Sequence, residues 1–130
     1  PMTALERVQK VETQMELTPE MSAVVEKRVP ALLEDLEREG VFFDESGDIG
    51  FISHAISLVK RLESGEKVKD LGEDVLSQLE EDALAISRKV LAPLEAAYGV
   101  TLDNSELALV TIHVQTAMMK MKKAQKRQQK

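Results

Sequence analysis

The most constraining feature of this sequence is the stretch 103–121, in which apolar residues recur at spacings of three and four. A helix has 3.6 residues per turn, so residues with this spacing share one face. Asp103 precedes the stripe and Glu106 follows three residues later, a combination typical of a capping box at a helix start. The stretch therefore predicts an amphipathic helix. Its apolar positions are Leu107, Val110, Val114, Ala117 and Met121.

The same spacing recurs along the chain, and glycines at 40, 65 and 99 supply natural helix ends. Hydrophobic residues make up 43% of the sequence but aromatic residues only 3%, which favours helices with an aliphatic core over a β fold. We therefore predict an all-α protein, a compact bundle of five or six antiparallel helices on short connections. The further stripes lie within 5–15, 24–36, 52–62, 68–79 and 83–97.

Local signals refine this prediction. Thr18 followed by Pro19 predicts a helix start, and Pro30 predicts a kink or a break within that helix. Residues 42–50 are rich in Asp, Ser and Gly, which predicts a loop. The acidic run 80–82 is expected to interrupt the pattern between two helices, and Pro93 is expected to bend the second of them.

Charge divides the chain unevenly. Residues 1–117 carry 11 basic and 23 acidic residues, a net charge of −12, whereas residues 118–130 carry six basic residues and none that is acidic. An acidic body repels phosphates, so direct nucleic-acid binding is not expected. We expect a helical extension over 1–18, a bundle over 19–120, and a basic tail over 121–130. That tail is interpreted as a solvated helix end, with an electrostatic binding arm as the alternative.

Several kinds of site are not expected. The chain has no cysteine, which excludes disulfides and thiolate metal sites. Asp44, Ser46 and Asp48 alternate as in a calcium loop, but Ile49 stands where that loop needs glycine. No nucleotide-binding or hydrolase motif is present, and no apolar run approaches the roughly 18–20 residues of a membrane helix. We therefore expect no metal, no cofactor, no enzymatic activity and no membrane span, in a cytoplasmic protein.

The sequence contains two histidines, each with a charged residue two helical turns away. Arg61 follows His54 by seven positions, and Glu106 precedes His113 by seven. A histidine beside an apolar helix face is most often a hydrogen-bonded boundary residue. Imidazole is also neutral and nucleophilic near pH 7, which suits it to accept a phosphoryl group.

These two segments resemble the PTS regulation domain, or PRD, of bacterial sugar antiterminators and activators. Residues 53–65 resemble the family's Asp-His-x4-Ile-x-Arg segment, although Ser53 stands where the family commonly has Asp. Residues 98–114 resemble its Gly-Val-x-Leu, Glu and Leu-His-Ile segments. The resemblance covers about residues 19–120 and rests on the order and spacing of both segments together.

The resemblance implies a single, stand-alone regulatory domain, usually a homodimer, acting in sugar-utilisation control and transcription regulation. It implies that His54 and His113 are the phosphoacceptors and that Arg61 and Glu106 support them. The implied phosphate donors are the carrier protein HPr or a sugar-specific enzyme II component, and another regulator is a possible partner. Phosphorylation then modulates dimerisation or partner binding.

Two alternatives stay open. Ser53 favours a protein-interaction module with the same fold that takes no phosphate, and its partner binding is then indifferent to substitution of either histidine. A weaker alternative is a nucleic-acid accessory protein that uses the basic tail, for which salt-sensitive binding is lost when residues 118–130 are removed.

Overall fold

The computed structural model describes residues 1–129, and every regular element in that range is helical, which confirms the all-α prediction. Five α-helices and one short 3-10 helix follow one another along the chain, in agreement with the predicted five or six helices. They are α1 (Ala4–Glu12), α2 (Pro19–Arg38), α3 (Glu45–Ser64), η1 (Val75–Gln78), α4 (Glu81–Tyr98) and α5 (Asn104–Gln128).

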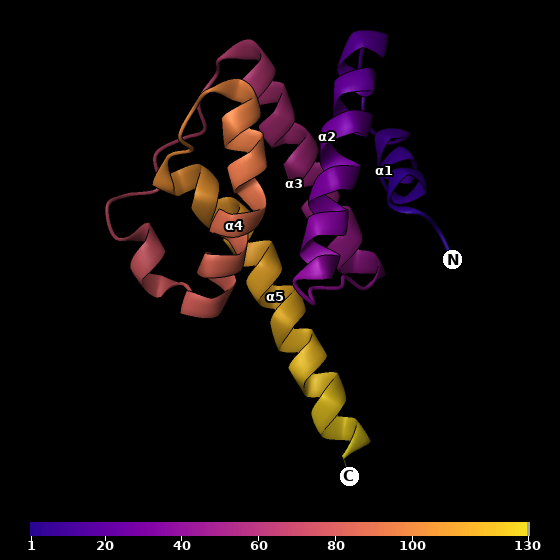
Figure 1. The fold of residues 1–130 in the computed structure, drawn as a ribbon, viewed down its shortest axis with the longest axis vertical. Coiled ribbons are helices and arrows are strands. Elements are labelled where there is room, and N and C mark those ends of the chain that lie inside the picture. The colour runs from indigo at the N-terminus through magenta and orange to yellow at the C-terminus, as the bar shows by residue number, and fades with distance from the viewer. Residues whose placement is uncertain (130) are drawn as a thin grey trace.

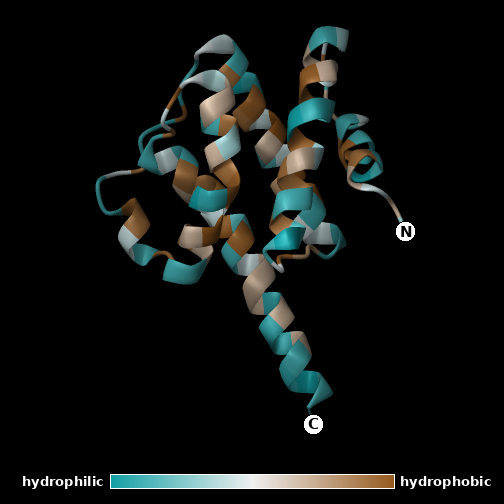
Figure 2. Cartoon of the chain, in the orientation of Figure 1, coloured by the Kyte–Doolittle hydropathy of each residue, from teal (hydrophilic) through white to brown (hydrophobic). Residues whose placement is uncertain are grey.

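Helices α3 and α5 form the centre of the arrangement (Figure 1). Helix α3 packs against α1, α2 and α5, whereas α5 packs against α3, α4 and η1. The first half of α5 lies inside the bundle, and its second half runs out beyond the other helices towards the C-terminus. That second half is hydrophilic over most of its surface (Figure 2). The C-terminal half of α5 is therefore attached to the bundle but not enclosed by it.

The core is aliphatic apart from one aromatic side chain, Phe51, which is 1% exposed. Most predicted apolar stripes point inwards, because side chains three and four positions apart leave water together. In α5 the predicted stripe is buried from Leu107 to Ala117 and becomes partly exposed at Met121, where the helix leaves the bundle. The largest fully buried side chains besides Phe51 are Leu33, Leu36, Ile52, Ile56 and Leu58.

Helix boundaries follow the polar signals in the sequence. The Thr18 hydroxyl accepts a hydrogen bond from the Met21 amide at 3.1 Å, as expected for the cap of α2. The Asp103 carboxylate accepts from the Glu106 amide at 2.9 Å at the start of α5. Gly65 and Gly99 end α3 and α4 with φ of 78° and 62°, values that side chains with a Cβ rarely adopt.

The prediction of a helix over residues 68–79 is wrong, because only Val75–Gln78 forms a 3-10 turn and the rest is a loop. Gly72 has φ of 101°, which no helix accommodates, and its amide donates to the Asp70 carboxylate at 2.8 Å. The Leu71 amide donates to the buried Ser105 hydroxyl at 2.9 Å. Local side-chain hydrogen bonds thus replace the helical ones in this segment.

One other local prediction needs correction, and of the kink or break predicted at Pro30 the break is excluded. The predicted loop 42–50 ends early, because the Asp44 carboxylate accepts from the Gly47 amide at 2.8 Å and starts α3 at Glu45. Helix α2 continues through Pro30 with no break. The boundary expected at 80–82 is confirmed, since α4 begins at Glu81.

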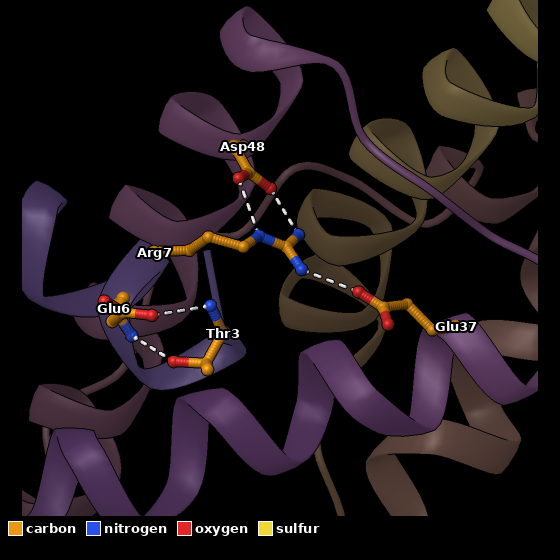
Figure 3. Close-up of polar contacts among 5 residues, drawn as sticks. All are labelled: Thr3, Glu6, Arg7, Glu37 and Asp48. Carbon is orange, nitrogen blue, oxygen red and sulfur yellow. Dashed lines mark hydrogen bonds and ion pairs between the residues drawn. The ribbon is translucent and has the colours of Figure 1, made fainter. Parts of the chain in front are cut away.

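Helix α1 is attached through one arginine that reaches two other helices (Figure 3). The Arg7 guanidinium donates to both carboxylate oxygens of Asp48 on α3, at 2.8 and 2.5 Å, and to Glu37 on α2 at 2.6 Å. Val8 and Val11 on the same helix are buried. This first helix therefore belongs to the packed body.

No helix among residues 1–129 has the length and apolar content to cross a membrane.

Candidate functional site

The four residues singled out in the sequence converge between two helices. His54 and Arg61 lie on α3, and Glu106 and His113 lie on α5. The two histidine rings face each other with centroids 5.7 Å apart, and Arg61 contacts Glu106. Because both pairs have the same seven-residue spacing, these contacts show that α3 and α5 run antiparallel with two helical turns between the pairs.

Arg61 and Glu106 form a bidentate ion pair. The Arg61 Nε and Nη2 atoms donate to the two carboxylate oxygens of Glu106 at 2.7 and 2.8 Å. The side chains are only 18% and 7% exposed, so water replaces little of this interaction. The hydrogen bonds to Glu106 raise the pKa of the Arg61 guanidinium above its ordinary value. The pair thus fixes the relative position of α3 and α5 two turns from the histidines.

This pairing corrects one sequence-based interpretation and defines the partner of Arg61. The Glu106 carboxylate does not close a capping box with Asp103, because it bonds Arg61 instead. Arg61 pairs with Glu106, and in this structure its hydrogen bonds go to Glu106 and not to His54. The spacing of seven in both helices therefore corresponds to two contacts between α3 and α5, His54 with His113 and Arg61 with Glu106.

His113 lies in close contact with the backbone of α3. A Cβ atom built on Gly50 would stand 3.2 Å from His113 Cε1 and 3.4 Å from Nδ1. Most side chains at position 50 would therefore displace the imidazole, which glycine leaves in place. The Phe51 ring meets His113 edge-on, with centroids 6.4 Å apart. Sequence reasoning missed Gly50, which stands in the segment expected to be a loop.

Both histidines favour the neutral form. Burial lowers the pKa of His54, and repulsion from His113 when that ring is protonated, and from Arg61, lowers it further. Burial also lowers the pKa of His113. Near pH 7 each ring then has one nitrogen without a proton, which is the state that a nucleophile or a phosphoryl acceptor needs.

The two histidines differ in access. His54 Nε2 is buried and has no hydrogen-bond partner among the described residues. His113 is half-buried and forms part of the wall of a surface groove of about 620 Å³. A large partner can therefore reach His113 from the groove, whereas Nε2 of His54 is covered in this conformation.

The groove runs between the start of α3 and the exposed half of α5, with His113 in its wall. Phe42, Phe43 and Met121 contribute apolar surface to it, and Lys120, Lys123 and Arg127 contribute positive charge. Lys120 Nζ lies 3.1 Å from Asp44 Oδ2, in a pair whose side chains are 46% and 52% exposed. Sequence reasoning assigned these cations to a solvated helix end, although Lys120 follows His113 by the same seven residues.

Among residues 1–129, no group of three or more acidic or histidine side chains is placed to hold a metal ion.

One of three comparisons with known proteins found a match. A family model described as PRD domain matches residues 31–117, about two thirds of the chain. That range contains all four residues of the α3–α5 contact. No curated protein and no solved structure matches the chain. The PRD is a regulatory rather than a catalytic domain of the phosphotransferase-system type. The chain therefore belongs to the PRD family.

Proposed function

We propose that this domain is a phosphohistidine switch, in which His113 accepts a phosphoryl group from HPr or an enzyme II component and thereby modulates dimerisation or partner binding. The observation that carries the proposal is the pairing of two imidazoles at the α3–α5 contact, with His113 open to a groove. Its setting is the control of sugar utilisation in a bacterial cytoplasm, through transcription regulators.

His113 is proposed as the first acceptor because its ring borders the groove, whereas Nε2 of His54 is covered. The Cε1–Nδ1 edge of His113 lies against Gly50, which leaves Nε2 as the proposed attacking atom. Nε2 of His54 becomes an acceptor only if the packing around it opens. Ser53 is consistent with phosphorylation of His113 before His54, because His54 lacks the adjacent carboxylate that the family commonly has at this position.

The proposed transfer balances without an external reagent. The lone pair of His113 Nε2 attacks phosphorus as the N–P bond of the donor phosphohistidine breaks. The donor ring keeps the bonding electrons and takes up a proton, and the His113 ring releases the proton from its other nitrogen to solvent. The acceptor protein contributes positioning and charge rather than covalent chemistry.

Positive groups on the same groove favour the phosphorylated state. Lys120 borders the groove with His113, and solvent screens its pair with Asp44, because both side chains are exposed. Lys120 can therefore turn towards a phosphoryl group at small cost. Each phosphoryl group adds about −1.5 to −2 charges and three acceptor oxygens beside a second, half-buried imidazole. This added charge is proposed to shift the packing of α3 against α5, and with it the surface offered to a partner or a second copy.

The runner-up is a protein-interaction module of the same fold that takes no phosphate. The covered His54 nitrogen and Ser53 favour it. Its partner binding is then unchanged by substitution of either histidine.

The test is a relay assay with phosphoenolpyruvate, enzyme I and HPr, with and without enzyme II components. We expect acid-labile label on the wild-type protein, loss of that label in His113→Gln, and retention in His54→Gln. Circular dichroism checks that each variant is folded. Labelling with phosphoramidate, a small phosphoryl donor, checks that His113 is reactive in the wild-type protein and in His54→Gln. Absence of label with every protein donor, while the wild-type protein is folded, contradicts the proposal and favours the interaction module.

A further inference from the structure

We infer that the groove beside His113 is the docking site for the phosphoryl donor, and that it selects a donor surface that is helical, acidic and partly apolar. This inference rests on the proposed function, because the donor must bring its phosphohistidine to His113. It adds the place where the donor binds and the chemistry by which the donor is recognised.

A row of cations extends from His113 along one face of α5. His113, Lys120 and Arg127 follow one another at intervals of seven residues, or about two turns. Lys123 also borders the groove, between the last two. From His113 to Arg127 the row spans about 21 Å at 1.5 Å per residue, which matches about four turns of a partner helix. A donor helix can thus lie along α5 while its reactive end reaches His113.

Apolar side chains from both sides of the groove accompany this row of cations. Phe42 is 52% exposed although it is a large aromatic residue, and Phe43 and Met121 border the same space. Aromatic and methionine side chains are enriched at protein interfaces because they bury much area when they are covered. An apolar strip flanked by positive charge fits an amphipathic helix whose polar side is acidic.

The difference in charge between the groove and the rest of the protein favours an acidic partner at the groove. Residues 118–129 contain five basic residues and no acidic one, on a chain whose first 117 residues carry a net charge of −12. An acidic donor is repelled by most of this surface and attracted to the exposed half of α5, which steers it to the histidine end. The apolar strip favours a protein over a nucleic acid, because phosphate backbones make no use of it.

The inference is tested by the rate of phosphoryl transfer from phospho-HPr to the full chain. The test variant is Lys123→Glu/Arg127→Glu, which leaves His113 and Lys120 unchanged. The matched control is Lys122→Glu/Lys126→Glu, with the same change of charge on the same helix but outside the groove. At donor concentrations below saturation we expect the groove variant to be labelled at least tenfold more slowly. The control variant should stay within about threefold of wild type, since it alters only the overall field.

Three additional measurements identify the step that changes. Saturating phospho-HPr should restore the labelling rate of the groove variant, because docking and not chemistry is impaired. Phosphoramidate should label both double variants and the wild-type protein at equal rates, because it needs no docking surface. Phe42→Ser should also raise the donor concentration that gives half the maximal rate, by threefold or more.

Other results overturn the inference and leave the proposed function intact. If phospho-HPr labels both double variants at the wild-type rate, or slows equally with both, the groove is not the docking site. A wild-type dimer that becomes monomeric in the groove variant, by sedimentation, identifies a second copy as the occupant. Binding of single-stranded RNA that only the groove variant loses identifies a nucleic acid. If phosphoramidate labels His113 but phospho-HPr and every enzyme II component fail, the proposed function fails as well.

Discussion

The Arg61–Glu106 ion pair gives the firmest test of how the site is held together. In the Arg61→Met variant, Glu106 keeps its position with a side chain only 7% exposed and loses both of its guanidinium hydrogen bonds. Removing one partner of a buried pair costs about 3–5 kcal/mol, because the remaining charge is neither solvated nor compensated. Arg61→Met should therefore lower the free energy of unfolding far more than the removal of one charge from an exposed ion pair does.

The expected change in melting temperature follows from the size of the domain. Unfolding entropy is about 2.1 cal/mol/K per residue, which for 130 residues gives about 0.27 kcal/mol/K. A loss of about 3–5 kcal/mol then lowers the midpoint by about 11–18 °C. Differential scanning calorimetry of Arg61→Met against the wild-type protein measures this shift directly.

Two further variants show whether the cost comes from the unpaired charge. The double variant Arg61→Met/Glu106→Leu removes both charges and should melt within about 4 °C of wild type, roughly 1 kcal/mol. Arg38→Met is the matched control, because Arg38 pairs with Asp35 in an exposed setting where an ion pair is worth at most about 1 kcal/mol. The reasoning is refuted if Arg61→Met melts no lower than Arg38→Met, or if the double variant melts below Arg61→Met.

Three other predictions concern the histidines and the first helix. Gly50→Ala adds a methyl group 3.2 Å from His113 Cε1. Alanine normally stabilises a helix by about 1 kcal/mol relative to glycine, but chemical denaturation should show no such gain in the free energy of unfolding, because the methyl group crowds the imidazole. The NMR resonances of the His113 ring should shift. Folding lowers the pKa of both histidines, so at mildly acidic pH the unfolded chain binds more protons than the folded one. The contribution of the two histidines to folding stability is therefore complete above about pH 6.5 and decreases as the pH falls through their folded pKa values. Urea midpoints between pH 7.5 and 5.5 should show this slope, and His54→Gln/His113→Gln should flatten it; a slope unchanged in that double variant contradicts the assignment. Arg7→Ala should destabilise the domain by about 1–3 kcal/mol and raise amide exchange in Ala4–Glu12, whereas unchanged exchange shows that Val8 and Val11 hold α1 without Arg7.

The fold follows from the sequence wherever periodicity and end signals agree. In α5 the apolar spacing and Asp103 both indicate the same helix, and the structure confirms both. Residues 68–79 show why periodicity alone is insufficient, since the apolar spacing is present but Gly72 and the Asp70 side chain stabilise a loop. The competition between local hydrogen bonds and a helix depends on contacts such as Leu71 to Ser105, which only the tertiary structure supplies.

The four residues of the candidate site could be predicted from the sequence, but which of them contact each other could not. The spacing of seven places His54 and Arg61 on one face, and Glu106 and His113 on another. It contains no information on whether the two helices run parallel or antiparallel, and that direction decides that Arg61 meets Glu106 and His54 meets His113. Gly50 was missed for a related reason, because its role depends on a ring from α5 and not on its own neighbours in the chain.

The most direct test of the central proposal is to map the phosphoryl group on the intact chain after the phosphotransferase relay. Wild-type protein is incubated with phosphoenolpyruvate, enzyme I and HPr, with and without enzyme II components, and the modified residue is located by mass spectrometry under conditions that preserve phosphohistidine. The account predicts phosphate on His113, with His54 modified later or not at all. A protein that is folded and yet unmodified by every donor, or one that is modified at His54 before His113, contradicts it.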